Sequence, residues 1–279
     1  MLKLKNTALL TIVFIMFCCL IPAAGTESGK IPEKLKILAV GNSFSSNSLY
    51  YVWEMADELG IKEVTVANLY IGSCSLEKHL KNATNDEKAY KYYKKTDGKW
   101  VVTKNVSISE ALADEDWDYV MFLQYSGDAG KTSTYKPLNK LLKYVKKRVG
   151  ANTKLIWNMV WAYQGDYKAK RFADYNYDQN RMYKKIVNAT KKKVETNKNI
   201  AFIIPSGTAV RNARNSIFGD NFTTDGRHLT TDGKYIVGLT VVSKILDISP
   251  KKIGYCPDSI SQEMREVALE ASEKALENK

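Results

Sequence analysis

The chain has 279 residues, of which 44% are hydrophobic and 26% charged, and its formal net charge at pH 7 is +12. This composition suits one α/β domain or two small ones. It excludes a disordered chain, and also a collagen-like chain, which would need far more than 16 glycines and 6 prolines. Four cysteines are too few for a disulfide scaffold, and a single long apolar stretch excludes a membrane protein with several spans.

That apolar stretch lies at the N-terminus. Two lysines precede an uncharged run from Thr7 to Ala24, and the small residues Ala23 and Gly25 fit the −3 and −1 positions of a cleavage site. This order is typical of a secretory signal peptide, so we expect residues 1–25 to be removed and the protein to be secreted or held at the cell surface. An uncleaved N-terminal anchor is the alternative. After cleavage we expect no membrane span.

Removal of this segment changes the charge and the cysteine count. The segment carries two lysines and no acidic residue, so the net charge falls from +12 to +10, and Cys74 and Cys256 remain, free or paired. The basic residues are spread along the chain. They predict a solvated surface or attraction to an anionic cell-surface polymer, and export argues against a nucleic-acid partner.

After a polar linker at residues 26–34, apolar runs of strand length alternate with helical patterns. The predicted strands are Leu35–Val40, Val64–Leu69, Tyr119–Leu123, Lys154–Val160 and Ile200–Ile204. The predicted helices are Leu49–Leu59, Ser109–Asp114, Leu138–Val149, Tyr175–Glu195, Lys234–Leu246 and Ser259–Leu276. This alternation predicts an α/β fold in which residues 35–279 form one three-layer α/β/α sandwich around a mostly parallel, five-stranded sheet. An insertion near residues 82–105 fits neither pattern, and we expect a hairpin there around Asp97-Gly98.

In such sheets ligands bind beyond the carboxyl ends of the strands, so the loops after the strands are the places to look for a site. Gly41-Asn42-Ser43-Phe44-Ser45 follows the first strand, and a serine in this turn is suited to be a nucleophile. A helix N-cap cluster is the alternative. His228 follows Asp225 by three residues with a glycine between them, so the carboxylate can reach back to the imidazole. A capping or packing histidine after a turn-forming aspartate is the alternative. The other histidine, His79, is expected on a helix surface.

These motifs, with Gly72 after the second strand, resemble the SGNH (GDSL-like) hydrolase superfamily, whose members are three-layer α/β/α esterases and lipases. The resemblance spans residues 36–246. It implies that Ser43 is the nucleophile, His228 the base and Asp225 its orienting acid, with the backbone N–H groups of Ser43 and Gly72 in the oxyanion hole. The implied activity is a serine esterase that hydrolyses acyl esters, acetyl esters of carbohydrates in particular. The rival is a non-catalytic module on the same fold that binds carbohydrate or the cell surface.

The sequence departs from the superfamily pattern at two places. Asn42 stands where the superfamily has aspartate, and the usual Gly-x-Asn-Asp motif is absent after the third strand. Gln124 ends that strand, which resembles a less characterised branch of the superfamily with Gln in place of Asn, and it is the candidate for the third oxyanion donor. A structural amide is the alternative. Tyr125, Trp161 and Tyr163 follow strands at the same edge and are candidates for stacking on a sugar, or for packing.

Two other kinds of site fit the sequence less well. Residues 127–132 read Gly-Asp-Ala-Gly-Lys-Thr, similar to the end of a phosphate-binding loop, but the glycine that this motif requires at position 125 is a tyrosine. Two histidines and two remaining cysteines lack the spacing of a zinc site, so we expect no metal and no cofactor.

Overall fold

The computed structural model describes residues 30–277. The predicted signal peptide, at residues 1–25, and residues 26–29 of the linker lie outside the described residues. The described part of the chain builds a seven-stranded sheet in the order β4-β3-β2-β1-β5-β6-β7. Its strands are β1 (Lys34–Gly41), β2 (Glu63–Tyr70), β3 (Tyr90–Lys95), β4 (Trp100–Val106), β5 (Tyr119–Phe122), β6 (Lys154–Asn158) and β7 (Ile203–Ile204).

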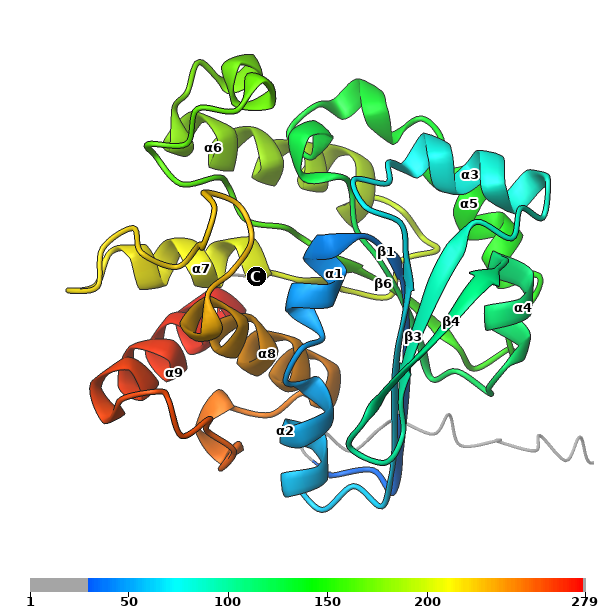
Figure 1. Ribbon diagram of the computed structural model, residues 1–279, viewed down its shortest axis with the longest axis horizontal. Helices are drawn as coiled ribbons and strands as arrows, with labels where there is room; N and C mark the ends of the chain where they lie inside the picture. Colours follow the sequence, from blue (N-terminus) through cyan, green and yellow to red (C-terminus); the bar gives the residue numbers. More distant parts are fainter. Residues whose placement is uncertain (1–29, 278–279) are drawn as a thin grey trace, which may run out of the picture.

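Helices cover both faces of this sheet. Figure 1 shows α2, α8 and α9 on one side of the sheet and α3, α4 and α5 on the other, which confirms the α/β fold with three layers. The helices are α1 (Ser43–Ser48), α2 (Val52–Glu58), α3 (Leu76–Thr84), α4 (Ile108–Ala113), α5 (Leu138–Lys146), α6 (Gln179–Thr190), α7 (Ser206–Arg214), α8 (Thr231–Leu246) and α9 (Gln262–Glu277). Within the described residues, no helix is both long and apolar enough to span a bilayer.

The parallel strands form because their apolar runs are buried on both faces, as a central parallel strand requires. In β1, every residue from Ile37 to Val40 is at most 1% exposed. β1, β2, β5, β6 and β7 pair in parallel, and these are the five predicted strands. The predicted number of five is nevertheless wrong for the whole sheet, since β3 and β4 extend it beyond β2.

β3 and β4 belong to the insertion near residues 82–105. They pair antiparallel with each other, and β3 pairs antiparallel with β2. The turn between them contains Asp97 and Gly98, where a hairpin was expected, and Gly98 has φ +74°. The sequence pattern here was weak because the outer strand is exposed along most of its length. The hairpin joins the sheet because it satisfies the open backbone edge of β2.

The register brings the carboxyl ends of the parallel strands to one edge. Gly41 of β1 lies opposite Tyr70 of β2, and the neighbouring Val40 lies opposite Phe122 of β5. The chain leaves β1 toward β2 on one side and later returns to β5 on the other, so β1 ends at the topological switch point of the sheet. Ser43 follows this point by two residues.

Candidate active site

The turn after β1 places Ser43 at the first position of α1. Asn42 is the N-cap residue, and its Oδ1 accepts a hydrogen bond from the Phe44 backbone N–H at 3.0 Å. The turn is tight at Gly41, where a Cβ would lie 2.2 Å from Ser45 Oγ, so glycine is required for this close approach. Since Ser43 begins the helix, its backbone N–H has no partner within the helix and is available to a ligand.

The loop between α7 and α8 carries Asp225 and His228 to the same place. One carboxylate oxygen of Asp225 accepts the backbone N–H groups of His228 at 2.8 Å and Arg227 at 3.1 Å. The other lies 2.7 Å from His228 Nδ1. Burial alone would raise the pKa of Asp225, but these hydrogen bonds outweigh it and lower the pKa to about 2. Asp225 is therefore ionised at neutral pH.

A continuous chain of hydrogen bonds joins the three side chains. His228 Nε2 lies 2.9 Å from Ser43 Oγ, and the carboxylate on its other side favours the tautomer with the proton on Nδ1. In that tautomer Nε2 accepts the proton of the Ser43 hydroxyl, which is the arrangement that activates a serine. The structure thus brings together the three residues singled out as nucleophile, base and orienting acid.

Three further hydrogen bonds fix the His228 loop against the body of the domain. Asn47 Oδ1 accepts the Leu229 N–H at 2.8 Å, and Trp161 Nε1 donates to the Arg227 carbonyl at 2.7 Å. The Gln164 N–H donates to the carbonyl of Gly226 at 2.8 Å. These contacts come from α1 and from the segment after β6, so the imidazole is held from two sides.

Trp161 does not have the role predicted for it. Its ring is fully buried and stacks on Phe44 with the ring centroids 4.3 Å apart, so neither face is free for a sugar. The prediction of a sugar-stacking Trp161 is therefore wrong. The physical reason is that the segment after β6 packs against the His228 loop. The indole lies on the ring of Phe44, next to Ser43, and its N–H holds the loop through the Arg227 carbonyl.

The same correction applies to Tyr163, and Tyr125 remains open. Tyr163 is 1% exposed, and its hydroxyl is 2.9 Å from Ser126 Oγ, so it is a packing residue and not a sugar-binding one. Burial raises the pKa of this phenol above its ordinary range. Tyr125 is half-buried, and its role in binding stays a prediction.

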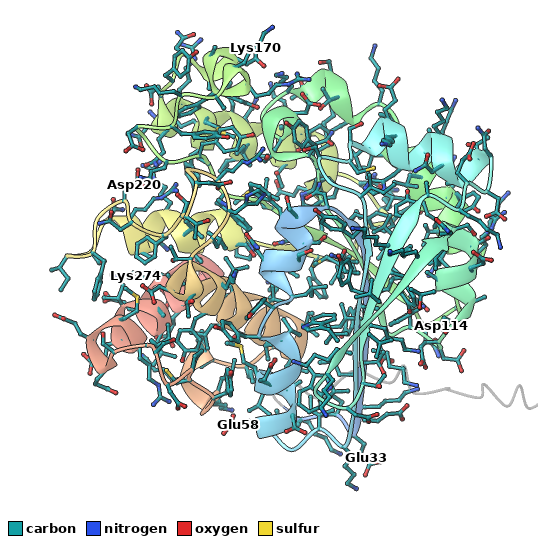
Figure 2. All side chains as sticks on the ribbon, viewed as in Figure 1. Glu33, Glu58, Asp114, Lys170, Asp220 and Lys274 are labelled. Atoms are coloured by element: carbon teal, nitrogen blue, oxygen red, sulfur yellow. The ribbon has the colours of Figure 1, made fainter. Side chains whose placement is uncertain are left out.

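A salt bridge anchors the other end of the His228 loop. Asp220, labelled in Figure 2, lies in this loop and pairs with Arg214 Nε at 2.6 Å. The second carboxylate oxygen accepts hydrogen bonds from Gly165 N and Gln179 Nε2, both at 2.8 Å. Because the Arg214 side chain is almost fully buried, Asp220 is the counter-ion that makes its burial tolerable.

Gln124 is not an oxyanion donor in this structure. Its Oε1 accepts the backbone N–H groups of Leu76 and Tyr125 at 3.2 and 2.8 Å, which fixes the orientation of the amide. Its Nε2 donates to the carbonyl and to the hydroxyl of Thr134, each at 3.1 Å. Both N–H groups are therefore engaged, and the prediction is wrong. Gln124 instead ties α3 to the loop that follows β5.

Asn158, another buried amide at this edge, is also engaged, with Ser48 and Ser206. The backbone N–H groups of Ser43 and Gly72 remain as candidate donors. Gly41 of β1 and Tyr70 of β2 are paired in the sheet. Ser43 lies two residues after Gly41 and Gly72 two residues after Tyr70, so the two turns are neighbours.

Asn42 connects these two turns. Its Nδ2 donates to the Cys74 carbonyl at 3.1 Å while its Oδ1 caps α1. An aspartate at this position could accept the capping bond but could not donate to the carbonyl. The asparagine that departs from the superfamily pattern thus holds the Gly72 turn against the Ser43 turn.

His79 lies in the core, and the prediction of a surface position is wrong. Its Nδ1 is 2.9 Å from the Tyr90 hydroxyl and 3.5 Å from Cys74 Sγ, and burial lowers its pKa to about 3. Leu76, His79 and Ala83 recur at helical spacing, and this signal would have identified the buried face of α3. Burial also raises the pKa of the Cys74 thiol to about 12, and Cys74 and Cys256 are both free.

Sequence reasoning missed a cavity of about 400 Å³ beside Ser43. Its walls come from α1 and the turn after it, from β2, and from the β3–β4 hairpin. The apolar and aromatic lining residues are Leu49, Tyr50, Tyr70, Tyr93, Trp100 and Val102. Alternation along β4, which turns Trp100 and Val102 to one face, was the available signal, but only the pairing of the hairpin with β2 brings that face to Ser43.

The segment similar to a phosphate-binding loop is held by ion pairs within the protein. Its Lys131 pairs with Asp128 and Asp174, and a short 3₁₀ turn follows it in place of the long helix that such a loop precedes. Over residues 30–277, no group of three or more His, Cys, Asp or Glu side chains is placed to hold a metal ion.

Comparisons with known proteins place the chain in a family. Residues 36–275 match the model described as "Domain of unknown function (DUF4886)". A crystal structure of a DUF4886 family protein from Bacteroides uniformis is 37% identical, with 87% of this chain and 95% of that chain covered and a TM-score of 0.84. A comparison with curated proteins finds no match.

Much weaker likenesses involve two acetylxylan esterases. Axe2 from Geobacillus stearothermophilus, solved as a catalytic mutant, is 11% identical, with 80% and 95% of the two chains covered and a TM-score of 0.46. AlAXEase is 12% identical, with 76% and 100% covered and a TM-score of 0.46. At this level neither likeness bears on the chemistry of this chain.

Proposed function

The chain belongs to the DUF4886 family, and we propose that it is a serine esterase with Ser43 as its nucleophile. One observation carries the proposal: the hydrogen bonds from Ser43 to His228 and from His228 to Asp225, at the switch point of the sheet. A buried serine network that served only packing would not require an ionised aspartate behind the imidazole. The half-buried Ser43, next to a cavity, is accessible to a substrate.

In the proposed reaction, Ser43 Oγ attacks the acyl carbonyl while His228 Nε2 takes its proton. Asp225 stabilises the imidazolium that forms, and the backbone N–H groups of Ser43 and Gly72 receive the oxyanion. His228 then gives the proton to the leaving alcohol, and an acyl-enzyme remains. Water attacks this intermediate with His228 again acting as base, which releases the acid and restores Ser43.

The finer part of the proposal concerns location and substrate. We propose that the protein is exported after cleavage behind Gly25 and that carbohydrate esters, acetyl esters among them, are its substrates, as the resemblance to the SGNH superfamily implies. The N-terminal sequence of protein recovered from the culture medium tests export, and it should begin at Thr26. Recovery only in the membrane fraction with an intact N-terminus would favour the anchor.

The esterase proposal is tested with protein lacking residues 1–25. It should hydrolyse p-nitrophenyl acetate, and Ser43→Ala should lower kcat by about 10⁴-fold or more. Ser259→Ala, which changes an exposed serine far along the chain, is the matched control and should leave the rate unchanged. A Ser43→Ala variant with the wild-type rate would refute the proposal.

A fluorophosphonate probe separates the esterase from the non-catalytic binding module. Labelling confined to Ser43 supports the enzyme, because the probe requires an activated serine. Binding of saccharide by the wild type without any labelling would favour the module instead.

A further inference from the structure

The cavity beside Ser43 lies on one side of the nucleophile only. Its lining residues come from α1 and the turn after it, β2 and the β3–β4 hairpin, and none comes from the α7–α8 loop that carries His228. In the proposed reaction the leaving oxygen must lie next to His228, since it takes its proton from Nε2. The alcohol part of the ester therefore faces the His228 loop, and the cavity lies on the acyl side.

The cavity is far larger than an acetyl group and extends away from the reacting atoms. Its lining residues run from Ser43 along α1 to Tyr50 in the turn after that helix. Tyr50 and Trp100 are partly exposed at its wall, with 44% and 36% of their surface accessible. An acetyl group would leave most of this space to water against apolar side chains, which is unfavourable.

The two asparagine side chains in the cavity wall make hydrogen bonds within the protein. Asn68 Oδ1 accepts from Ser45 Oγ at 2.8 Å, and Asn68 Nδ2 donates to Ser46 Oγ at 2.9 Å. Asn47 Oδ1 holds the Leu229 N–H. These asparagine groups are therefore held within the protein, and most of the surface that an occupant would cover is aliphatic or aromatic, which favours an apolar group.

The hairpin wall is held rigidly enough to select a ligand. Lys95 of β3 is 4% exposed and pairs with Glu54 of α2 at 2.6 Å, and its ammonium lies over the rings of Trp53 and Trp100. Trp53 Nε1 donates to the carbonyl of Thr96, in the hairpin turn, at 2.9 Å. These contacts preorganise the wall, so binding requires little reordering of the hairpin.

We propose that this cavity is the acyl pocket of the enzyme and that it takes a straight, apolar acyl chain longer than acetyl. The proposal rests on the proposed esterase function and refines its acyl group, while the alcohol part stays as proposed above. Trp100 and Val102 of β4 are the residues that set the chain length, because they form the part of the pocket wall that β4 contributes.

The test uses p-nitrophenyl esters of acetic, butyric, hexanoic and octanoic acid, which share one leaving group. Each methylene buried in the pocket contributes about 0.8 kcal/mol, so kcat/KM should rise up to about four-fold per added methylene until the pocket is full. Acetates of methanol, hexanol and phenol form the second series. If kcat/KM rises with the size of the alcohol and not with the acyl chain, the acyl assignment is overturned.

Variants of β4 connect the selectivity to this wall. Trp100→Ala should lower kcat/KM for the hexanoate by about tenfold and change that for the acetate by less than about twofold, since acetate does not reach the indole. Val102→Trp should fill the pocket and favour the acetate over the hexanoate. Val101→Ala is the matched control, because Val101 alternates to the other face of β4 and is 65% exposed.

The outcomes separate this inference from the esterase proposal. Absence of hydrolysis and of fluorophosphonate labelling would refute the proposed function itself. Hydrolysis that depends on Ser43 but shows no preference for longer acyl chains would refute the acyl pocket alone. A preference that survives both Trp100→Ala and Val102→Trp, in variants with the wild-type melting temperature, would also overturn it.

Discussion

Gly226 lies in the turn between Asp225 and His228, and its replacement by alanine tests how far the conformation of this turn is constrained. Gly226 has φ +83°, in the left-handed region that favours glycine, and a Cβ there would lie 2.3 Å from Cδ2 of the Tyr167 ring. The backbone conformation costs a residue other than glycine about 1–2 kcal/mol, and overpacking of this kind costs typically about 1–3 kcal/mol. We therefore expect Gly226→Ala to lower the free energy of unfolding by about 2–5 kcal/mol if the turn keeps its shape.

The turn can also relax, and then the cost appears in catalysis. A displacement of about 1 Å at His228 can lower kcat by about 10²-fold. The alternatives are distinguished by measuring urea denaturation and ester hydrolysis on the same variant. A wild-type stability together with a wild-type kcat would refute the reasoning, because it would mean that neither the backbone conformation nor the ring contact constrains the turn.

Gly219 provides the matched control in the same loop. It has φ +58°, but nothing lies within 4 Å of the position of its Cβ. Gly219→Ala therefore carries the backbone cost without the contact with Tyr167, and the difference between the two variants measures the contact. The double variant Gly226→Ala with Tyr167→Ala should recover part of that difference.

Three further changes test other parts of the site. Asn42→Asp should lower the free energy of unfolding by about 1–3 kcal/mol, because it removes the donor to the Cys74 carbonyl and places a carboxylate beside that carbonyl. Urea denaturation measures the change, and an unchanged midpoint would contradict the prediction. His79 stays neutral in the folded protein down to about pH 3 but ionises near pH 6.5 when unfolded, so the free energy of unfolding should fall as the pH is lowered from 6.5 to 3, by up to about 1.4 kcal/mol per pH unit. In urea denaturation at a series of pH values, His79→Gln should flatten this dependence, and an equal dependence in the variant would refute the assignment. Asp220→Ala should lower the free energy of unfolding by about 1–3 kcal/mol or more and lower kcat, because it leaves the buried Arg214 unpaired. If urea denaturation and ester hydrolysis showed the free energy of unfolding and kcat unchanged, the pair would not hold the His228 loop.

The local hydrophobic pattern of the sequence was enough to predict the parallel part of the sheet. Each of its strands is a short apolar run, and such a run can be buried on both faces only in the middle of a layered fold. The glycine after the first strand and the three-residue spacing of Asp225 and His228 are local as well. A turn of that length allows a carboxylate to reach back to an imidazole, so the sequence was enough to single out both residues.

Contacts between segments that are apart in the sequence determine the features that the local pattern did not predict. Gln124 is a suitable oxyanion donor by its position, yet its amide is held by Leu76 and Thr134, which lie 48 residues before it and 10 after it. Trp161 is buried because the His228 loop folds over it, and no pattern around residue 161 shows that loop.

The cavity beside Ser43 is the strongest case of this kind. Its far wall is a hairpin whose outer strand is exposed along most of its length, so the hydrophobic pattern that identifies strands is missing there. Only the pairing of β3 with the open edge of β2 places Trp100 and Val102 in the same cavity wall as Ser43. The sequence was therefore enough to single out Ser43, Asp225 and His228 as candidates, because their placement depends on short turns. The tertiary structure decided what surrounds Ser43, because that depends on backbone hydrogen bonds between segments far apart in the chain.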